Sequence, residues 1–328
     1  MHAPQICIYG LGAIGGLVAA RLALAGYTVN AIARGETLAQ VQAHGLTLHD
    51  AQGTRTVPVH AVQQPQALGV QDVVVVSVKT TALAEVARQM APLIGPDTVV
   101  LSAMNGIPWW FLRGLQGAPA GLQLDSVDPA GAISQALPAQ QVLGCVTHLS
   151  AAVPQPGHVR HVAGQRLILG RPQGALIAAD QALVQMLGAA GFEVEVAPSI
   201  QAEIWYKLWG NMTMNPVSML TRATGDQILD DPDVQDFLTR CMREAADIGA
   251  RLGLPIAMSP QERHQVTRKL GAFKTSMLQD LEGHKPLELD ALLRVVIEIG
   301  QQVGVDMPNL QTLMGLSRLK ARNLGLYP

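Results

Sequence analysis

Cysteine is scarce in this sequence, and no two cysteines are spaced as a pair. Its 328 residues include three, Cys7, Cys145 and Cys241, with no Cys-x-x-Cys motif. This excludes a disulfide-rich scaffold and a cysteine-based zinc site. The nine histidines show no metal-ligand or triad spacing, so we expect no metal ion. A chain with so few cysteines fits a reducing compartment, and we expect the cytoplasm.

Aromatic residues, charge and long apolar runs are also limited. Aromatic residues make up 4% and charged residues 15%, and the net charge is −2 with no basic run. This composition argues against a nucleic-acid partner. No apolar stretch is long enough to span a bilayer, so no membrane segment is expected. The first apolar run, residues 6–26, contains five glycines and an arginine and lacks a basic leader. It therefore predicts a strand, a turn and a helix rather than a secretion signal.

Hydrophobic residues reach 48%, which allows a large buried core, and the length favours two domains. Strands and helices alternate in the first 198 residues. Strands are expected at 5–9, 27–33, 73–78, 98–103, 142–150, 158–162, 166–170 and 192–197, a hairpin at 46–60, and helices near 14–24 and 180–190. This alternation predicts a doubly wound α/β sheet of the Rossmann type.

The pattern changes at Pro198. Residues 199–328 are helical by period, with breaks expected at Pro216, Gly225, Pro255, 283–286 and Pro308. We therefore predict an α/β domain at 1–198 and an all-α domain at 199–328. Residues 109–141 show no clear hydrophobic periodicity of either a helix or a strand. We interpret them as a long loop on the surface of the first domain.

A glycine motif follows the first strand and opens the first helix. It reads Gly10-Leu11-Gly12-Ala13-Ile14-Gly15. The first glycine permits a tight turn, the second lets a pyrophosphate approach the backbone, and the third lets helix and strand pack closely. The helix N-terminus then points its positive end at the phosphates. The alternative is a glycine-rich turn without a ligand, but the strand–turn–helix context favours a dinucleotide site.

The end of the second predicted strand bears on which nicotinamide cofactor is used. An acidic residue there would bind the ribose 2′-hydroxyl of NAD, whereas a cation suits the 2′-phosphate of NADP. The chain has Arg34 at this point and no acid at the strand end, although Glu36 could pair with Arg34. We therefore predict NADPH.

Two further polar residues follow predicted strands. Lys79 comes directly after the apolar run 73–78, where a lysine can neutralise a phosphate or face a substrate carbonyl. Asn105 follows the run 98–103, where an amide can bind both substrate and cofactor. Each has a structural alternative, since Lys79 could simply begin a helix and Asn105-Gly106 is a common turn pair.

A polar stripe marks the first helix of the second domain. Glu203, Lys207, Asn211 and Asn215 are spaced four apart, which places them on one face. Bulky apolar residues occupy the other faces: Trp205, Leu208, Trp209 and Met212. The alternative is a surface helix with a Glu203–Lys207 ion pair worth about 0.3–0.5 kcal/mol. We favour a site in which Lys207 protonates the alkoxide formed when a ketone accepts a hydride.

Taken together, these motifs resemble the ketopantoate reductase (2-dehydropantoate 2-reductase) family over nearly the whole chain. The matching pieces, in chain order, are Gly10–Gly15, Arg34, Ser77–Lys79, Asn105-Gly106, Glu203–Pro216, Thr275–Asp280 and Leu287–Asp290. The resemblance implies an NADPH-dependent reductase of a small 2-oxo acid, acting in pantothenate and coenzyme A synthesis. It leaves the oligomeric state open, with a homodimer among the options.

The resemblance also implies roles for individual residues. The lysine at position 207 would be the proton donor. Substrate would be held by five residues: Asn105, Asn211, Asn215, Thr224 and Ser276. Cofactor would be held by the glycine motif, Arg34, Lys79, Asn105, Ser150 and Glu288.

Two departures from the family pattern leave the identity of the 2-oxo acid open. Thr224 stands where the family has another substrate-binding asparagine, and the segment after Asn105 is longer by roughly twenty residues. This segment carries Trp109 and Trp110, which we predict to shape the substrate pocket. The alternatives are a paralogous reductase of a bulkier 2-oxo acid, a β-hydroxyacid dehydrogenase, and a non-catalytic NADPH sensor.

Overall fold

A computed structural model describes residues 3–328, which fall into two units. Unit 1 holds the chain up to Met104 together with Ala132–Ile200, and unit 2 holds Asn105–Gly131 and Gln201–Pro328. The turn to the helical unit at Ile200 lies close to the predicted boundary. The segment 105–131, however, belongs to the helical unit and not to the surface of the α/β unit.

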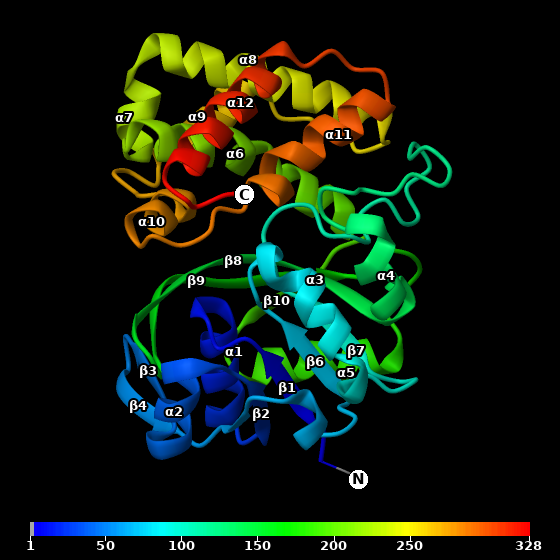
Figure 1. Ribbon diagram of the computed structural model, residues 1–328, viewed down its shortest axis with the longest axis vertical. Coiled ribbons are helices and arrows are strands. Elements are labelled where there is room, and N and C mark those ends of the chain that lie inside the picture. Colours follow the sequence, from blue (N-terminus) through cyan, green and yellow to red (C-terminus); the bar gives the residue numbers. More distant parts are fainter. Residues whose placement is uncertain (1–2) are drawn as a thin grey trace. The chain divides into compact units, whose positions relative to one another are not determined.

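Unit 1 is built on a mixed ten-stranded sheet (Figure 1). Its strands run in the order β4-β3-β9-β8-β7-β6-β1-β2-β5, and β10 pairs with β9. The bounds are β1 Ile6–Tyr9, β2 Val29–Ile32, β3 Leu46–Asp50, β4 Gly53–Val57, β5 His60–Val62, β6 Val73–Val76, β7 Val99–Ser102, β8 Val142–Gln155, β9 His158–Gly170 and β10 Glu193–Val196. The six strands from β5 to β8 are parallel, which confirms the predicted Rossmann-type sheet.

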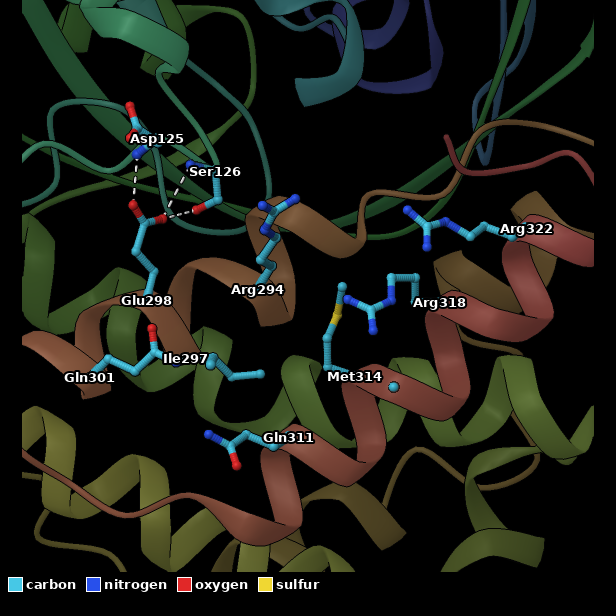
Figure 2. A pocket seen from close by; sticks show the side chains of 11 residues that line it. Asp125, Ser126, Arg294, Ile297, Glu298, Gln301, Gln311, Met314, Arg318 and Arg322 are labelled. Atoms are coloured by element: carbon cyan, nitrogen blue, oxygen red, sulfur yellow. Dashed lines mark hydrogen bonds between the residues drawn. The ribbon is translucent and has the colours of Figure 1, made fainter.

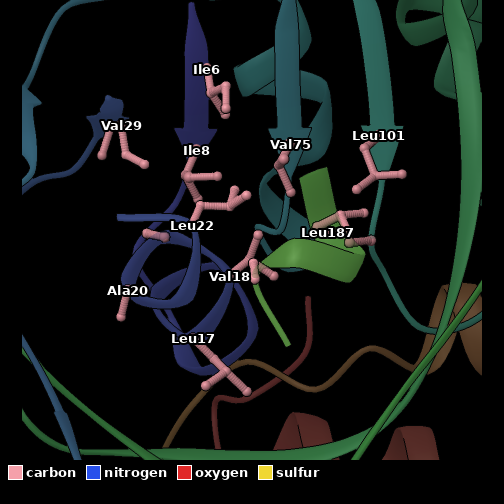
Figure 3. Packing of buried hydrophobic residues seen from close by; sticks show 14 of the residues in the cluster. Ile6, Ile8, Leu17, Val18, Ala20, Leu22, Val29, Val75, Leu101 and Leu187 are labelled. Carbon is pink, nitrogen blue, oxygen red and sulfur yellow. The ribbon is translucent and has the colours of Figure 1, made fainter. Parts of the chain in front are cut away.

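The central strands β1 and β6 are short and fully buried because both faces of the sheet are covered there. The helices of unit 1 are α1 Ala13–Leu24, α2 Gly35–His44, α3 Thr80–Gln89, α4 Ala132–Ala136 and α5 Ala178–Ala189. Helix α1 contacts β1, β2, β3, β4, β8 and β9, and the long strands β8 and β9 curve around it (Figure 1). Figure 3 shows Val18 and Leu22 of this helix on the side that faces Ile8 and Val75, whereas Leu17 points to the opposite side.

The predicted hairpin at 46–60 forms only in part. β3 and β4 pair antiparallel from Leu46 opposite Val57 to Asp50 opposite Gly53. Pro58 has no N–H to donate and follows the end of β4, and the next residues form β5 against β2 instead. The two strands predicted at 158–162 and 166–170 are one continuous strand, β9.

Unit 2 is helical. Its elements are α6 Ile200–Thr221, α7 Gly225–Asp230, α8 Pro232–Arg251, α9 Pro260–Arg268, α10 Ser276–Glu282, a π-helical turn η5 at Asp290–Arg294, α11 Val295–Gln302 and α12 Pro308–Asn323. The predicted break at Pro216 is wrong, because α6 continues through it. Met212 and Met219 on either side are fully buried, so tertiary packing keeps the helix intact despite the missing N–H.

Candidate active site

The glycine motif forms the turn between β1 and α1. Gly10 has φ +99°, a conformation that favours glycine, and α1 begins one residue after Gly12. No side chain caps this helix and no acidic residue lies in its first turn. Gly12 is exposed, and a Cβ there would have no heavy atom within 4 Å. The helix N-terminus is therefore uncapped and accessible to an anion.

The third glycine of the motif is required by close packing. A Cβ on Gly15 would lie 2.1 Å from both the Gly10 carbonyl oxygen and the Ser77 Oγ. Ser77 Oγ donates a hydrogen bond to that carbonyl oxygen at 2.9 Å, which ties the turn to the end of β6. Ser77 was not among the predicted site residues, although two signals in the sequence could have identified it: its position directly after the apolar strand and its place in the family motif Ser77–Lys79.

The charged residues predicted for the cofactor lie at two strand ends of unit 1. Arg34 precedes α2 and forms an ion pair with Glu85 at 3.4 Å rather than with Glu36. The side chains of Arg34 and Glu85 are 59% and 51% exposed, so this pair leaves the guanidinium accessible to an anion. Lys79 is half-buried and precedes α3. Both therefore occupy the loop edge that follows parallel strands.

The other two predicted cofactor residues lie in different units. Ser150 is exposed on β8, where the pairing with β9 is irregular on both sides of it. Glu288 belongs to unit 2, is half-buried, and accepts a backbone hydrogen bond from Leu292 in the π-helical turn at 3.2 Å.

Helix α6 is held in unit 2 by its tryptophans. Trp205 and Trp209 are each 1% exposed. Trp209 Nε1 donates to the Met242 carbonyl oxygen on α8 at 2.7 Å, and Trp205 stacks on Phe111 with ring centroids 6.0 Å apart. These contacts fix the rotation of α6 about its axis. The helix face that carries Glu203, Lys207, Asn211 and Asn215 therefore has a fixed orientation within unit 2.

Lys207 is half-buried and is joined to a residue far away in the chain. Its Nζ donates a hydrogen bond to Asn105 Oδ1 at 2.8 Å. The turn that carries Asn105 is held by the backbone, because Ile107 N donates to the Ala291 carbonyl oxygen at 2.8 Å. Gly106 has φ +82°, and a Cβ there would lie 2.4 Å from the same oxygen. This close approach, which only glycine permits, anchors Asn105 beside the lysine.

The remaining substrate residues also lie in unit 2. Asn215 is buried, and its Nδ2 lies 3.5 Å from Ser276 Oγ at the start of α10. Asn211 lies one helical turn from both Lys207 and Asn215 and is half-buried. The structure thus brings Lys207 together with Asn105, and Asn215 together with Ser276, with Asn211 between the two pairs along α6.

Thr224 has a local role. Its hydroxyl donates a hydrogen bond to Asp226 Oδ1, and its backbone N–H donates to Gln227 Oε1 at 3.0 Å. It therefore stabilises the start of α7. Among the described residues, no hydrogen bond joins Thr224 to Lys207, Asn211 or Asn215.

The two tryptophans of the long segment are part of the core of unit 2. Trp109 is 7% and Trp110 1% exposed, and Phe111 is fully buried against Trp205. Their predicted effect on the substrate pocket stays a prediction, but it would act through the position of Asn105 rather than through direct contact.

Among residues 3–328 no group of three or more histidine, cysteine, aspartate or glutamate side chains is arranged to hold a metal ion. The same residues contain no helix with both the length and the apolar character needed to cross a membrane.

Known proteins resemble this chain over both units. The family model described as Ketopantoate reductase PanE/ApbA matches residues 6–174, and the one described as Ketopantoate reductase PanE/ApbA C terminal matches residues 199–321. The 2-dehydropantoate 2-reductase of Mesorhizobium japonicum (strain LMG 29417 / CECT 9101 / MAFF 303099) is 40% identical over 324 residues, 98% of this chain and 99% of that protein.

Solved structures share the fold. A protein from Ralstonia solanacearum MolK2 is 53% identical with a TM-score of 0.96, covering 99% of this chain and 100% of that one. D-mandelate dehydrogenase, solved with NADH and anilino(oxo)acetate, is 20% identical with a TM-score of 0.83, covering 98% and 99% of the two chains. The latter likeness concerns the fold alone.

Proposed function

Because the chain belongs to the ketopantoate reductase family and is an oxidoreductase of that family, we propose that it reduces 2-dehydropantoate to pantoate with NADPH. This reaction would place it in pantothenate and coenzyme A synthesis. Its three cysteines are free and buried, which supports a reducing compartment, the cytoplasm.

In this proposal unit 1 binds the cofactor. The turn Gly10–Gly15 and the uncapped N-terminus of α1 bind the pyrophosphate, and Arg34 binds the 2′-phosphate. Lys79, Ser150 and Glu288 are further proposed contacts. When bound, the cofactor supplies the hydride that reduces the substrate ketone.

The observation that carries the proposal is the hydrogen bond from Lys207 Nζ to Asn105 Oδ1 at 2.8 Å. It holds a cationic donor in a half-buried position, where it can polarise the substrate carbonyl and give its proton to the forming alkoxide. The amides of Asn211 and Asn215 and the hydroxyl of Ser276 lie along the same stretch of unit 2 and can orient the carboxylate and hydroxyl of the substrate.

The test is a panel of 2-oxo acids with NADPH and with NADH, followed by loss of nicotinamide absorbance. We expect 2-dehydropantoate to give the highest kcat/KM among them. If a bulkier or aromatic 2-oxo acid is reduced and 2-dehydropantoate is not, the chain is a paralogous reductase, and the proposed substrate is wrong. If none of the 2-oxo acids is reduced, the proposed catalytic role is wrong as well.

A further inference from the structure

Unit 2 contains a pocket that the proposed reaction does not use. Its volume is about 620 Å³, and it lies between α11, α12, the π-helical turn and residues 125–126 (Figure 2). Neither Lys207 nor any of the residues proposed to bind substrate or cofactor is among the described residues that line it. Its size falls in the range of pockets that hold small molecules.

Three arginines line this pocket. Arg294 comes from the π-helical turn, and Arg318 and Arg322 extend from one face of α12 because they are four residues apart (Figure 2). Arg294 lies 3.6 Å from Asp290, and Arg322 Nε donates to the Pro328 carbonyl oxygen at 2.6 Å. Arg318 makes no hydrogen bond or ion pair within residues 3–328. Arg322 also lies over the ring of Tyr327, 5.9 Å from its centroid. All three arginines are exposed, so a ligand can reach them, but Arg294 already shares its charge with Asp290.

The carboxylates of the pocket do not cancel this charge in direct pairs. Glu298 accepts hydrogen bonds from Asp125 N at 2.7 Å, from Ser126 N at 3.1 Å and from Ser126 Oγ (Figure 2). Within the described chain, neither Glu298 nor Asp125 forms an ion pair with the arginines. Glu298 thus connects the segment 105–131 to α11. Neither Glu298 nor Asp125 neutralises the three arginines.

A glycine keeps the wall of the pocket open. Gly315 lies inside α12 on the same stripe as Gln311, Arg318 and Arg322, and it lines the pocket. Glycine destabilises a helix interior relative to alanine. A Cβ at Gly315 would meet no heavy atom within 4 Å, so packing within the chain does not require a glycine here. Its effect is to expose the helix backbone to the pocket.

We propose that this pocket binds an organic anion that carries two or more phosphate charges, such as a nucleoside polyphosphate. Guanidinium groups bind phosphate oxygens in a bidentate manner, and three of them suit more than one phosphate. The amides of Gln301 and Gln311 add neutral donors, and Ile297 and Met314 offer apolar surface to the organic part. The net charge of −2 and the absence of a basic run favour a small molecule over a nucleic acid.

The test is calorimetric titration of ATP into the enzyme saturated with NADP⁺, so that the dinucleotide site of unit 1 is already filled. We expect binding that weakens with added salt. Arg318→Gln removes the arginine that has no hydrogen-bond or ion-pair partner among the described residues, and should weaken ATP binding about ten- to a hundredfold. The matched control is Arg243→Gln, which removes an exposed arginine of α8 outside the pocket and should leave the affinity unchanged.

A second pair of variants distinguishes a loss of ligand binding from a loss of stability. Gly315→Ala should keep ATP binding and raise the thermal midpoint slightly, because alanine favours the helix and meets no neighbour. Gly315→Leu places a bulky side chain on the same helix face as Arg318 and Arg322, and should weaken ATP binding without lowering the midpoint below that of the wild type. The proposal is overturned if the wild type binds ATP more weakly than about 1 mM, or if Arg318→Gln binds it as tightly as the wild type. A change of oligomeric state in Arg318→Gln without ATP binding would also overturn it, by assigning the arginines to a contact between copies.

Discussion

Lys207 is the residue on which the proposed chemistry depends. Removing its ammonium in Lys207→Ala should lower kcat by about 10²- to 10⁴-fold, because the alkoxide loses its proton donor. Lys207→Arg keeps the charge but cannot give up a proton, so it should not restore the rate. Steady-state kinetics with 2-dehydropantoate measures both. NADPH affinity, followed by fluorescence titration, should change little in either variant; turnover near the wild-type value in Lys207→Ala would rule out the assignment.

Arg34 decides the cofactor preference. Its ion pair with Glu85 is exposed and therefore worth little, about 1 kcal/mol or less, so a 2′-phosphate can compete for the guanidinium. We expect NADPH to bind about ten- to a hundredfold more tightly than NADH, and Arg34→Ala to remove most of that difference. Fluorescence titration of both cofactors measures it, with Glu85→Ala as the control that keeps the arginine. Equal affinities in the wild type would contradict the NADPH assignment.

The buried thiol of Cys7 should make the unfolding free energy fall as the pH rises in the alkaline range. Burial raises the pKa of its thiol from 9.0 to about 12. The unfolded chain therefore ionises first, so the stabilisation is complete below about pH 9 and is lost as the pH rises toward 12, by about 1.4 kcal/mol per pH unit. Urea unfolding at about pH 8 to 10.5 should show a shallower loss in Cys7→Ala than in the wild type. If the unfolding free energy falls with pH by the same amount in both proteins, the Cys7 thiol has the same pKa in the folded and the unfolded chain, and the prediction is wrong.

At the residue scale, spacing in the sequence predicted much of the candidate site. Steps of four predicted that Lys207, Asn211 and Asn215 share one helix, and α6 contains all three. The sequence also predicted Asn105 as a site residue. It did not predict the hydrogen bond between Asn105 and Lys207, which are 102 residues apart, because periodicity carries no information on contacts between distant segments.

The turn at Gly106 is the element that positions Asn105. In Gly106→Ala the side chain would be strained by a positive φ and would press on the Ala291 carbonyl oxygen, so we expect a loss of about 2–4 kcal/mol in unfolding free energy. Gly121→Ala in the same segment is the control. It has φ +74° and open space around its Cβ, and should cost only about 1–2 kcal/mol.

Urea unfolding measures the stability of both variants, and kinetics gives a second readout. Gly106→Ala should also lower kcat because Asn105 moves away from Lys207, whereas Gly121→Ala should not. If both variants lose the same stability and keep full activity, the contact with Ala291 does not position the site.

At the scale of elements, local patterns predicted the central parallel strands and, in unit 1, helices α1 and α5. They did not predict α2, α3 and α4, and they assigned β5 to a hairpin. Apolar runs such as 73–76 are unambiguous because both faces of the strand are buried. Pro216 predicted a break that buried neighbours prevent, and the curl of the sheet around α1 depends on strand pairs that the sequence does not specify.

The two units of the whole molecule are interleaved in the sequence, and this determines which fragments can fold. A fragment of residues 1–200 contains the segment 105–131 without the helices it packs against. We expect it to aggregate, because Trp110 and Phe111 would be exposed. Replacing 105–131 by a short Gly/Ser linker should give a more soluble fragment. Sedimentation of both fragments tests this, and a monomeric, soluble fragment 1–200 would contradict it.

The same interleaving affects the protein while it is being made. Phe111 leaves the ribosome long before Trp205, the aromatic ring on which it stacks. At about 5–20 residues per second, the roughly 90 residues between them take about 5–20 seconds to synthesise. During that time an apolar segment that interrupts the nascent α/β unit has no core to enter. The nascent chain must therefore depend on a chaperone or on transient burial of this segment, and translation speed through residues 112–205 becomes a determinant of yield.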